Sequence, residues 1–301
     1  VEGTYTLSMV GTDEDVAAAG DLDITSDLEI IGVTALASTI DAAQLDRVFD
    51  VRTGATLTFE SVTLTRGMVT GGEDGGAIRN AGTLNVTRAT LTGNSALGSM
   101  TAHGGAIYNV GTTDLLDVQV SNNTAAGGGG GLMNDGGVVR IHNSTFNGNL
   151  ATAQGGGGIK NSGTLVVDAS TFIQNSATNN YFGGGIYSES GAFTLSHSQV
   201  TANSATFGGG LVVGEGTILD STFAQNSAVY GGGVFKLSPK LVNVIDSRIE
   251  YNTATSRGGG LYADKSVSLV GVTIAHNNSG EGGGLFKAGG GGDTSTATLT
   301  K

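Results

Sequence analysis

The sequence predicts an all-β fold, a right-handed parallel β-helix of about eleven or twelve coils with three short strands per coil. The first observation behind this prediction is a run of glycines ending in an aliphatic residue, which occurs nine times between residues 75 and 285. The second is an Asn, followed two residues later by Ala, that keeps in step with the glycine runs. A period of 23 to 29 residues indicates a solenoid, in which each repeat buries its apolar face against its neighbours.

The glycine runs require a physical reason, because Gly inside a strand is about 0.5–1 kcal/mol less favourable than Ala. Their repetition predicts either a corner with positive φ or a line along which a Cβ atom would collide with the coil above. The runs are Gly75-Gly76-Ala77-Ile78, Gly104-Gly105-Ala106-Ile107, Gly129-Gly130-Gly131-Leu132, Gly156-Gly157-Gly158-Ile159, Gly183-Gly184-Gly185-Ile186, Gly208-Gly209-Gly210-Leu211, Gly231-Gly232-Gly233-Val234, Gly258-Gly259-Gly260-Leu261 and Gly282-Gly283-Gly284-Leu285.

The Asn marker defines a second fixed position in each repeat. It lies 15 to 18 residues after the aliphatic residue of one glycine run and 8 to 13 residues before that of the next. Length variation is therefore confined to the corner that follows the marker, here called the variable corner. Stacked Asn side chains are expected to hydrogen-bond to the backbone and to one another at a buried bend. The markers are Asn94, Asn123, Asn149, Asn175, Asn203, Asn226, Asn252 and, as a variant, Asn277.

The chain divides into three parts: N-terminal coils at residues 1–67, the glycine and Asn repeat at 68–288, and a Gly-rich link with a terminal strand at 289–301. In the first part, apolar and polar residues alternate as in half-buried strands. Strands are expected there at residues 4–9, 22–24, 28–31, 47–51, 56–59 and 62–65.

Residues 155–179 illustrate one repeat, with strands expected at 155–161, 164–167 and 171–173. Inward side chains then form apolar ladders along the axis, in a core one residue wide. One ladder contains the aliphatic residues of the glycine runs, and a second includes Leu84, Leu165 and Leu195. A third contains Leu91, Val120, Phe146, Phe172, Val200, Phe223, Ile249 and Ile274.

Composition and charge exclude several classes of protein. The 301 residues include 53 Gly, one Pro and no Cys, yet Gly has no three-residue period and spaced aliphatic residues persist, so neither collagen nor a disordered linker is expected. The formal net charge of −12 argues against nucleic acid or an anionic membrane as a partner. No run of about 18 apolar residues could form a membrane span.

The densest group of oxygen ligands lies near the N-terminus and consists of Asp13, Glu14, Asp15, Asp21 and Asp23. Hard cations prefer clustered carboxylates and carbonyls, so this group is a candidate Ca²⁺ site that would order the first coils. The alternative is a solvated acidic loop. No other cofactor is expected.

The residue after each glycine-run aliphatic is expected to point outward, because side chains alternate along a strand. Five aromatic residues in nine exposed positions exceed what solubility requires. We expect a contact surface for glycan stacking, for a neighbouring molecule or for a loop from the variable corner; ordinary cross-strand aromatic packing is the alternative. This contact column consists of Tyr108, Met133, Tyr187, Val212, Phe235, Tyr262 and Phe286, with Arg79 and Lys160 in the same register.

A polysaccharide-degrading enzyme on this fold would need carboxylates gathered on one face. The candidates are Asp117, Asp220 and Asp246, with Asn143 and His197 at the same place in their coils. Tight corners favour the same residue types, because their side chains cap backbone amides, and we prefer that interpretation. The four histidines fall in different registers, so no metal site or catalytic pair is expected among His103, His142, His197 and His276.

Both ends of the sequence are rich in β-forming residues, which predicts head-to-tail self-association. Residues 294–301 would pair with the first coil of the next copy by strand addition. The alternative is that the ends mark a boundary with further coils beyond. The joining residues would be Thr4, Tyr5, Leu7 and Met9 at one end, and Thr296, Ala297 and Leu299 at the other.

Two stretches of sequence resemble known families. The pairing of Gly-Gly-Ala-Ile at 75–78 and 104–107 with Phe-x-x-Asn at 146–149, 172–175 and 223–226 resembles the repeats of polymorphic outer membrane proteins, which are β-helical surface adhesins carried by autotransporters. Residues 3–67, with Gly3-Thr4-Tyr5-Thr6-Leu7, Glu14-Asp15, Gly20-Asp21-Leu22-Asp23-Ile24 and Arg47-Val48-Phe49, resemble the start of secreted bacterial β-helix proteins with a CSLREA-type motif. The resemblance implies the β-helix and an extracellular setting.

The sequence thus predicts a non-enzymatic, extracellular structural or adhesive protein, displayed on a bacterial surface or assembled head to tail into a fibre. Its partners would be further copies of itself, a glycan or a host cell surface. The alternative is a polysaccharide-binding or polysaccharide-degrading β-helix, a lyase or a hydrolase. Such enzymes surround one face with long loops, whereas here no loop between markers much exceeds about a dozen residues. The variable corner is longest after Asn94, so a recognition loop containing Met100 and His103 is expected near the beginning of the solenoid.

Overall fold

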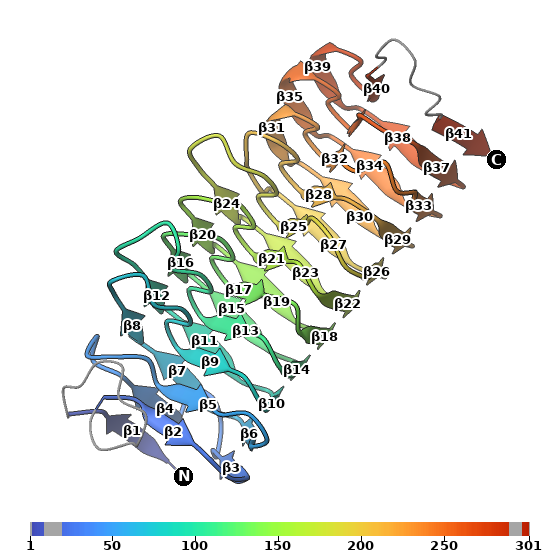
Figure 1. The fold of residues 1–301 in the computed structure, drawn as a ribbon. Coiled ribbons are helices and arrows are strands. Elements are labelled where there is room, and N and C mark those ends of the chain that lie inside the picture. The colour runs from blue at the N-terminus through green and yellow to red at the C-terminus, as the bar shows by residue number, and fades with distance from the viewer. Residues whose placement is uncertain (1, 9–19, 289–296, 301) are drawn as a thin grey trace.

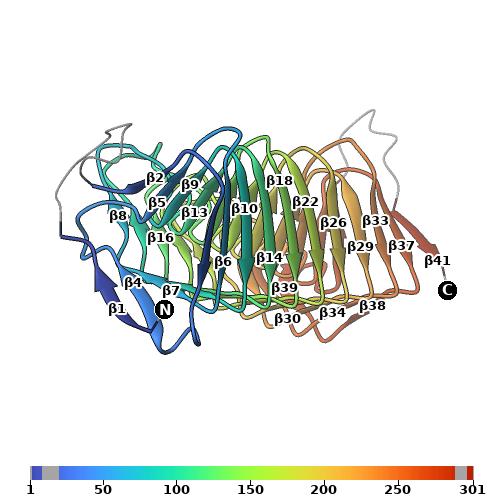
Figure 2. The same ribbon diagram turned by 90° about the horizontal axis from the view of Figure 1, so that it is seen from below.

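The chain winds into an elongated β-solenoid of about ten turns, and each turn adds one strand to each of three parallel sheets (Figures 1 and 2). The structure is a computed structural model that describes residues 2–8, 20–288 and 297–300, and no helix occurs in these ranges. Ten steps between eleven strands, at the usual spacing of about 4.8 Å, give a stack about 48 Å long. The expected parallel β-helix is confirmed.

The three long sheets, here named A, B and C, contain eleven strands each. Sheet A consists of β1 (Gly3–Thr6), β4 (Ser38–Asp41), β7 (Thr63–Thr65), β11 (Thr90–Thr92), β15 (Gln119–Ser121), β19 (Thr145–Asn147), β23 (Thr171–Ile173), β27 (Gln199–Thr201), β30 (Thr222–Ala224), β34 (Arg248–Glu250) and β38 (Thr273–Ala275). Sheet B consists of β2 (Leu22–Ile24), β5 (Phe49–Val51), β9 (Ile78–Asn80), β13 (Ile107–Asn109), β17 (Leu132–Asn134), β21 (Ile159–Asn161), β25 (Ile186–Ser188), β28 (Leu211–Val213), β32 (Val234–Lys236), β36 (Leu261–Ala263) and β40 (Leu285–Lys287). Sheet C consists of β3 (Leu28–Ile31), β6 (Thr56–Glu60), β10 (Thr83–Thr87), β14 (Thr112–Leu116), β18 (Val138–His142), β22 (Thr164–Asp168), β26 (Phe193–Ser196), β29 (Gly216–Leu219), β33 (Val242–Ile245), β37 (Val267–Val270) and β41 (Ala297–Thr300).

Two short sheets follow the Asn markers at the start of the variable corner. One contains β8 (Met68–Val69), β12 (Ser95–Ala96), β16 (Thr124–Ala125), β20 (Leu150–Ala151) and β24 (Ser176–Ala177). The other contains β31 (Ser227–Tyr230), β35 (Thr253–Arg257) and β39 (Asn278–Glu281). The sequence-based strands at 22–24, 28–31 and 171–173 match β2, β3 and β23 residue for residue, whereas β4 and these two short sheets were not expected.

One continuous apolar core fills the interior of the solenoid. The ladder from Leu91 to Ile274 is confirmed, because each of its members pairs with the next across sheet A. The expected second ladder needs correction: Leu165 pairs with Phe193, while Leu195 pairs with Val167. Strands of sheet C turn two residues inward rather than one, so this side of the core is two residues wide.

Both explanations expected for the glycine runs hold, each for a different glycine. The first glycine of every run has a φ between 61° and 75°, the left-handed region that Gly adopts without strain. The second glycine lies against the neighbouring coil, so that a Cβ atom on Gly157 would be 2.4 Å from the carbonyl oxygen of Gly184. Side chains are therefore excluded from this line of the solenoid.

The Asn markers form the expected buried ladder along the axis. Asn175 is typical: its Oδ1 accepts hydrogen bonds from the backbone N–H of Asn149 at 3.0 Å and from its Nδ2 at 2.9 Å. Its own Nδ2 donates to the carbonyl of Phe146 at 2.9 Å and to Oδ1 of Asn203 at 3.0 Å. The same pattern joins the markers from Asn94 to Asn277, so each buried amide is satisfied by the coils on either side.

Candidate functional site

The contact column lies on the outer face of sheet B, but much of it is covered. Met133, Tyr187, Val212 and Phe235 are buried, and Tyr108, Tyr262 and Phe286 are half-buried. The expectation that all these side chains are exposed is therefore wrong. Alternation along the strand correctly placed them outside the solenoid core, but it carried no information about which loops fold over that face.

Three aromatic side chains from the variable corner provide the cover. Phe182, Phe207 and Tyr230 stack on one another along the axis, with ring centroids 4.9 and 5.4 Å apart. Phe207 also meets Phe235 edge to face at 5.5 Å, and Phe182 lies 5.3 Å from Tyr187. With Tyr187, Val212 and Phe235 they form an apolar cluster separate from the main core. Several roles were considered for the contact column. Around Tyr187 and Phe235, the column contacts loops of the variable corner.

The other half of the same face is polar. The hydroxyl of Tyr108 donates to Oδ2 of Asp135 at 2.7 Å, and burial is the main cause that raises the pKa of Tyr108. Lys160 donates to Oε1 of Gln154 at 2.8 Å, and burial lowers the pKa of this ammonium group. The face thus changes from charged to aromatic along the axis.

Asp74 and His103 belong to this polar half. Burial raises the pKa of Asp74 to about 6, although its Oδ1 accepts the backbone N–H of His103 at 2.8 Å. The ring nitrogen Nδ1 of His103 accepts the N–H of Gly128 at 2.9 Å, and burial lowers the pKa of the ring. A neutral imidazole and a carboxyl group with a pKa of about 6 therefore lie within the variable corner.

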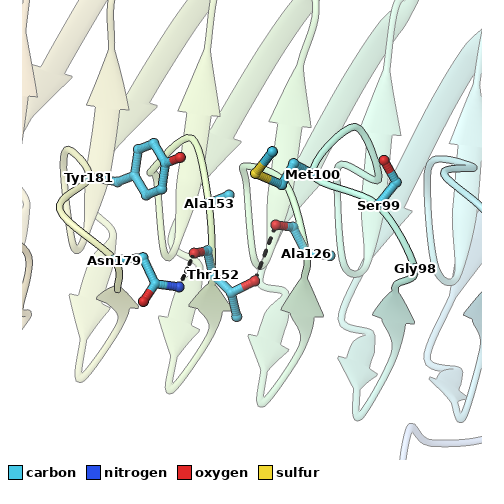
Figure 3. Close-up of a pocket in the computed structure, with 8 residues that line it drawn as sticks. All are labelled: Gly98, Ser99, Met100, Ala126, Thr152, Ala153, Asn179 and Tyr181. Carbon is cyan, nitrogen blue, oxygen red and sulfur yellow. Dashed lines mark hydrogen bonds between the residues drawn. The ribbon is translucent and has the colours of Figure 1, made fainter.

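A notch of about 300 Å³ opens on the outside of the variable corner, between the loop that carries Met100 and the loop that carries Tyr181 (Figure 3). Figure 3 shows Ala153 between these two side chains. Thr152 and Asn179 lie on the same side of the notch, and Nδ2 of Asn179 donates to the carbonyl of Thr152 at 2.8 Å. Met100, in the longest variable corner, is 64% exposed. The notch thus includes part of the loop that sequence length had singled out.

The carboxylate candidates for an enzyme all occupy one corner column between sheets C and A. Asp117, Asn143, His197, Asp220 and Asp246 each have a φ between 46° and 57°. Asn and Asp enter this left-handed region more readily than most residues. Their shared backbone conformation supports the corner interpretation, since each coil needs a left-handed residue at this point.

Two histidines meet across this corner, although their sequence registers differ. His142 Nδ1 lies 3.1 Å from Oδ2 of Asp168, and His197 Nδ1 lies 2.7 Å from its Oδ1. The hydrogen bond with His197 is the main cause that lowers the pKa of Asp168 and raises that of His197. Sequence reasoning missed this cluster because His197 is one residue further along its coil and reaches back to the preceding one. Within the part of the chain that the structure describes, no group of three or more His, Cys, Asp or Glu side chains could hold a metal ion.

The acidic group near the N-terminus is only partly described. Asp13, Glu14 and Asp15 lie outside the described residues. Asp21 and Asp23 each face an arginine, with Oδ2 of Asp21 3.2 Å from Nε of Arg47 and Oδ1 of Asp23 2.6 Å from the guanidinium of Arg52. Burial raises the pKa of Asp21 to about 7. The Ca²⁺ site stays a prediction, with two of its five carboxylates already in ion pairs.

The expected pairing of terminal strands between copies stays a prediction, and the structure shows where these strands lie within one chain. β41 pairs with β37 of its own chain in sheet C, with Ala297 opposite Val267 and Leu299 opposite Leu269. β1, with Thr4 and Tyr5, pairs with β4 in sheet A, and Leu7 packs against the core. Met9 and Thr296 lie outside the described residues.

A second column of buried amides was missed. Asn80, Asn109, Asn134 and Asn161 are linked from coil to coil by side-chain hydrogen bonds of 2.7 to 2.9 Å at the corner between sheets B and C. The signal was present in the sequence, because each lies two residues after a glycine-run aliphatic residue in four successive coils. Further along the same column lies a fully buried lysine, Lys236.

No family model matches this chain, and searches of curated proteins and of solved structures give no match either. The resemblance to polymorphic outer membrane proteins and to CSLREA-type proteins stays a prediction. Among the described residues there is also no helix suited to crossing a membrane.

Proposed function

We propose that this protein is a non-enzymatic, extracellular structural and adhesive element, a stiff β-solenoid that presents the loops of its variable corner to a surface. The observation that carries the proposal is the contrast between three regular sides and one irregular side. Sheets A, B and C keep the same strand register from coil to coil, while loop length and exposed side chains vary at the variable corner. Binding residues tend to lie on loops held by a rigid scaffold.

Stiffness follows from the way coils are joined. Every coil is tied to the next by parallel strand pairing and by the buried Asn ladder, and the core is continuous along the axis. Such a rod keeps a binding edge at a fixed distance and orientation. Self-association into fibres remains a prediction of the same proposal.

The proposal is tested by measuring adhesion and, in the same samples, cleavage of the polysaccharide. Labelled protein is passed over polysaccharide-coated surfaces and over bacterial and animal cell layers, and both retention and newly formed reducing ends are measured. We expect retention on at least one surface and no release of sugar. The proposal would be overturned if the protein were retained on none of the surfaces, or if it released sugar products.

Polysaccharide cleavage is the second candidate, because Asp74, Asp135 and Tyr108 place two carboxyl groups and a phenol on one half-covered face. A carboxyl group with a pKa of about 6 is suited to general acid or base catalysis. Release of reducing ends by the wild type, lost in Asp74→Asn and kept in Asp246→Asn on the corner column, would favour this function.

A further inference from the structure

The notch at the variable corner lies between two loops that belong to different coils. The first follows Asn94 and carries Ser99 and Met100; the second follows Asn175 and carries Asn179 and Tyr181. Three coil steps separate these loops, about 14 Å at the usual strand spacing. The two intervening coils have shorter loops; Ala126 from one, and Thr152 and Ala153 from the other, form part of the floor. The notch is thus a gap in a row of loops.

The walls of the notch are fixed in place. Gln154 donates from Nε2 to the carbonyl of Met100 at 2.7 Å, which ties the first loop to a coil two turns away. The backbone carbonyl of Tyr181 accepts the N–H groups of Thr206 and Phe207, both at 3.2 Å. A site whose walls are held in this way loses little conformational entropy when a ligand binds.

Backbone strain is concentrated here as well. Asn179 and Asn180 have φ values of 59° and 68°, and Gln154 has 57°. Most other non-glycine residues with positive φ belong to the two corner columns that recur in every coil; these three do not. Residues held in sparsely populated conformations cluster at functional sites.

The chemistry of the lining selects among ligands. Every residue that lines the notch is uncharged, in a protein with a net charge of −12. Tyr181 offers an aromatic face, and Ser99, Thr152 and Asn179 offer hydroxyl and amide groups. Among the described residues, the Tyr181 hydroxyl and Oδ1 of Asn179 have no hydrogen-bond partner. An aromatic face combined with uncharged hydrogen-bonding groups suits a ring that has an apolar face and hydroxyl groups at its edge.

We propose that this notch binds a neutral sugar segment of a glycan, with one sugar ring against Tyr181 and hydrogen-bonded to Asn179, and the next unit of the chain directed towards Ser99 on the opposite wall. The volume of about 300 Å³ is at the lower end for ligand sites, which suits one or two sugar units of a longer chain. The inference rests on the proposed adhesive function and specifies the ligand of its binding edge. An anionic glycan is disfavoured, because the notch has no cationic residue in its lining and the whole protein is acidic.

Calorimetry with defined hexasaccharides tests the proposal. The probes are the neutral β-linked hexamers of glucose, mannose and galactose, and hexagalacturonate as the anionic counterpart. Tyr181→Ala removes the aromatic wall, and Tyr251→Ala, an exposed tyrosine stacked on His276 several coils away, is the matched control. We expect at least one neutral hexamer to bind the wild type and Tyr251→Ala alike, and to bind Tyr181→Ala about tenfold more weakly. Asn179→Ala should weaken the same interaction, which gives a second variant if one does not fold.

Each other result overturns the inference: no neutral hexamer binds, the anionic hexamer binds more tightly, or binding by Tyr181→Ala equals that of the wild type. The adhesive function can fail separately. In that case the neutral hexamer still binds in a Tyr181-dependent manner, while the labelled protein is retained on no surface. Conversely, retention that is unchanged in Tyr181→Ala would support adhesion and reject the notch as its site.

Discussion

At the scale of single residues, Lys236 is the least expected feature of the interior. It is fully buried in β32, and its Nζ donates to the carbonyls of Gly214, at 2.8 Å, and Ser238. Burial lowers the pKa of Lys236 to about 8, from an ordinary value of 10.5. Two backbone carbonyls thus replace the water that a lysine ammonium normally has.

Lys236 predicts a pH dependence of stability. Below about pH 8 the ammonium is charged in both the folded and the unfolded state, and the full cost of burial is present. Between about pH 8 and pH 10.5 the folded state has lost a proton that the unfolded state still holds, so the free energy of unfolding rises with pH, by up to about 3 kcal/mol. Urea unfolding of the wild type and Lys236→Met at pH 7.5 and 10 measures this, and parallel changes in both proteins would contradict it.

The pair of His197 and Asp168 predicts a smaller effect, because both side chains are partly exposed. The raised pKa of His197 means that its contribution is present at low pH and lost as pH rises through that pKa. The lowered pKa of Asp168 means that its contribution is lost as pH falls through it. The pair therefore stabilises the fold mainly between these two values. In Asp168→Asn, the pKa of His197 measured by NMR should fall towards its ordinary value. An unchanged pKa would contradict the interaction between His197 and Asp168.

The glycine line predicts position-specific intolerance. Gly157→Ala would place a Cβ atom 2.4 Å from a carbonyl oxygen and 2.5 Å from the backbone nitrogen of Ser176. We expect a loss of roughly 3 kcal/mol or more in the free energy of unfolding, because the obstructing atoms are backbone. The control is Gly136→Asn, at a turn with φ of 78° where nothing lies within 4 Å, and it should cost less than about 1 kcal/mol. Equal losses in both variants would reject the explanation.

At the scale of elements, the buried Asn ladder is the feature that ties each corner to the next. Asn175→Ala would remove the acceptor of the backbone N–H of Asn149 and the side-chain donor to the carbonyl of Phe146, and Oδ1 of Asn203 would keep only the backbone N–H of residue 175. Because each unsatisfied buried group costs about 1–3 kcal/mol, we expect a loss of several kcal/mol in chemical unfolding. Asn85→Ala is the control, since that side chain lies on the outer face of sheet C with one hydrogen bond, to Thr58. A similar loss in both variants would show that the ladder has no special role.

Elements that repeat once per coil could be predicted from the sequence. Contacts between a loop and the outer face of a sheet could not. The ladder of Asn markers was predictable because one residue type recurs at one phase and buried amides must be satisfied. A loop over the contact column was only one of several roles considered, and the residues that form it were not identified, although Phe182, Phe207 and Tyr230 each stand directly before a glycine run in three successive coils. Period alone shows which residues share a column; it does not show which loop folds over that column. The notch depends on loop length in four coils together, and no single repeat contains it.

The whole molecule behaves as a stack of equivalent coils, which predicts that one coil can be removed. Deletion of residues 149–174 takes out one repeat from marker to marker and joins Gly148 to Asn175. The ladder then continues from Asn123 to Asn175, and the rod should shorten by about 4.8 Å while it stays folded. Small-angle scattering and circular dichroism test this. Deletion of residues 149–161, about half a repeat, is the control: it puts the remaining strands out of phase with the coils on either side and should unfold at lower temperature.

The constant joint between coils also bears on how the length of the solenoid could change. The Asn amides all point the same way, each donating towards the next marker from Asn94 to Asn277. A gene that duplicates or loses a repeat would therefore change reach in fixed increments without designing a new joint. Each repeat added or lost would also shift the loops of the variable corner along the axis by the same increment, without changing the way that coils are joined.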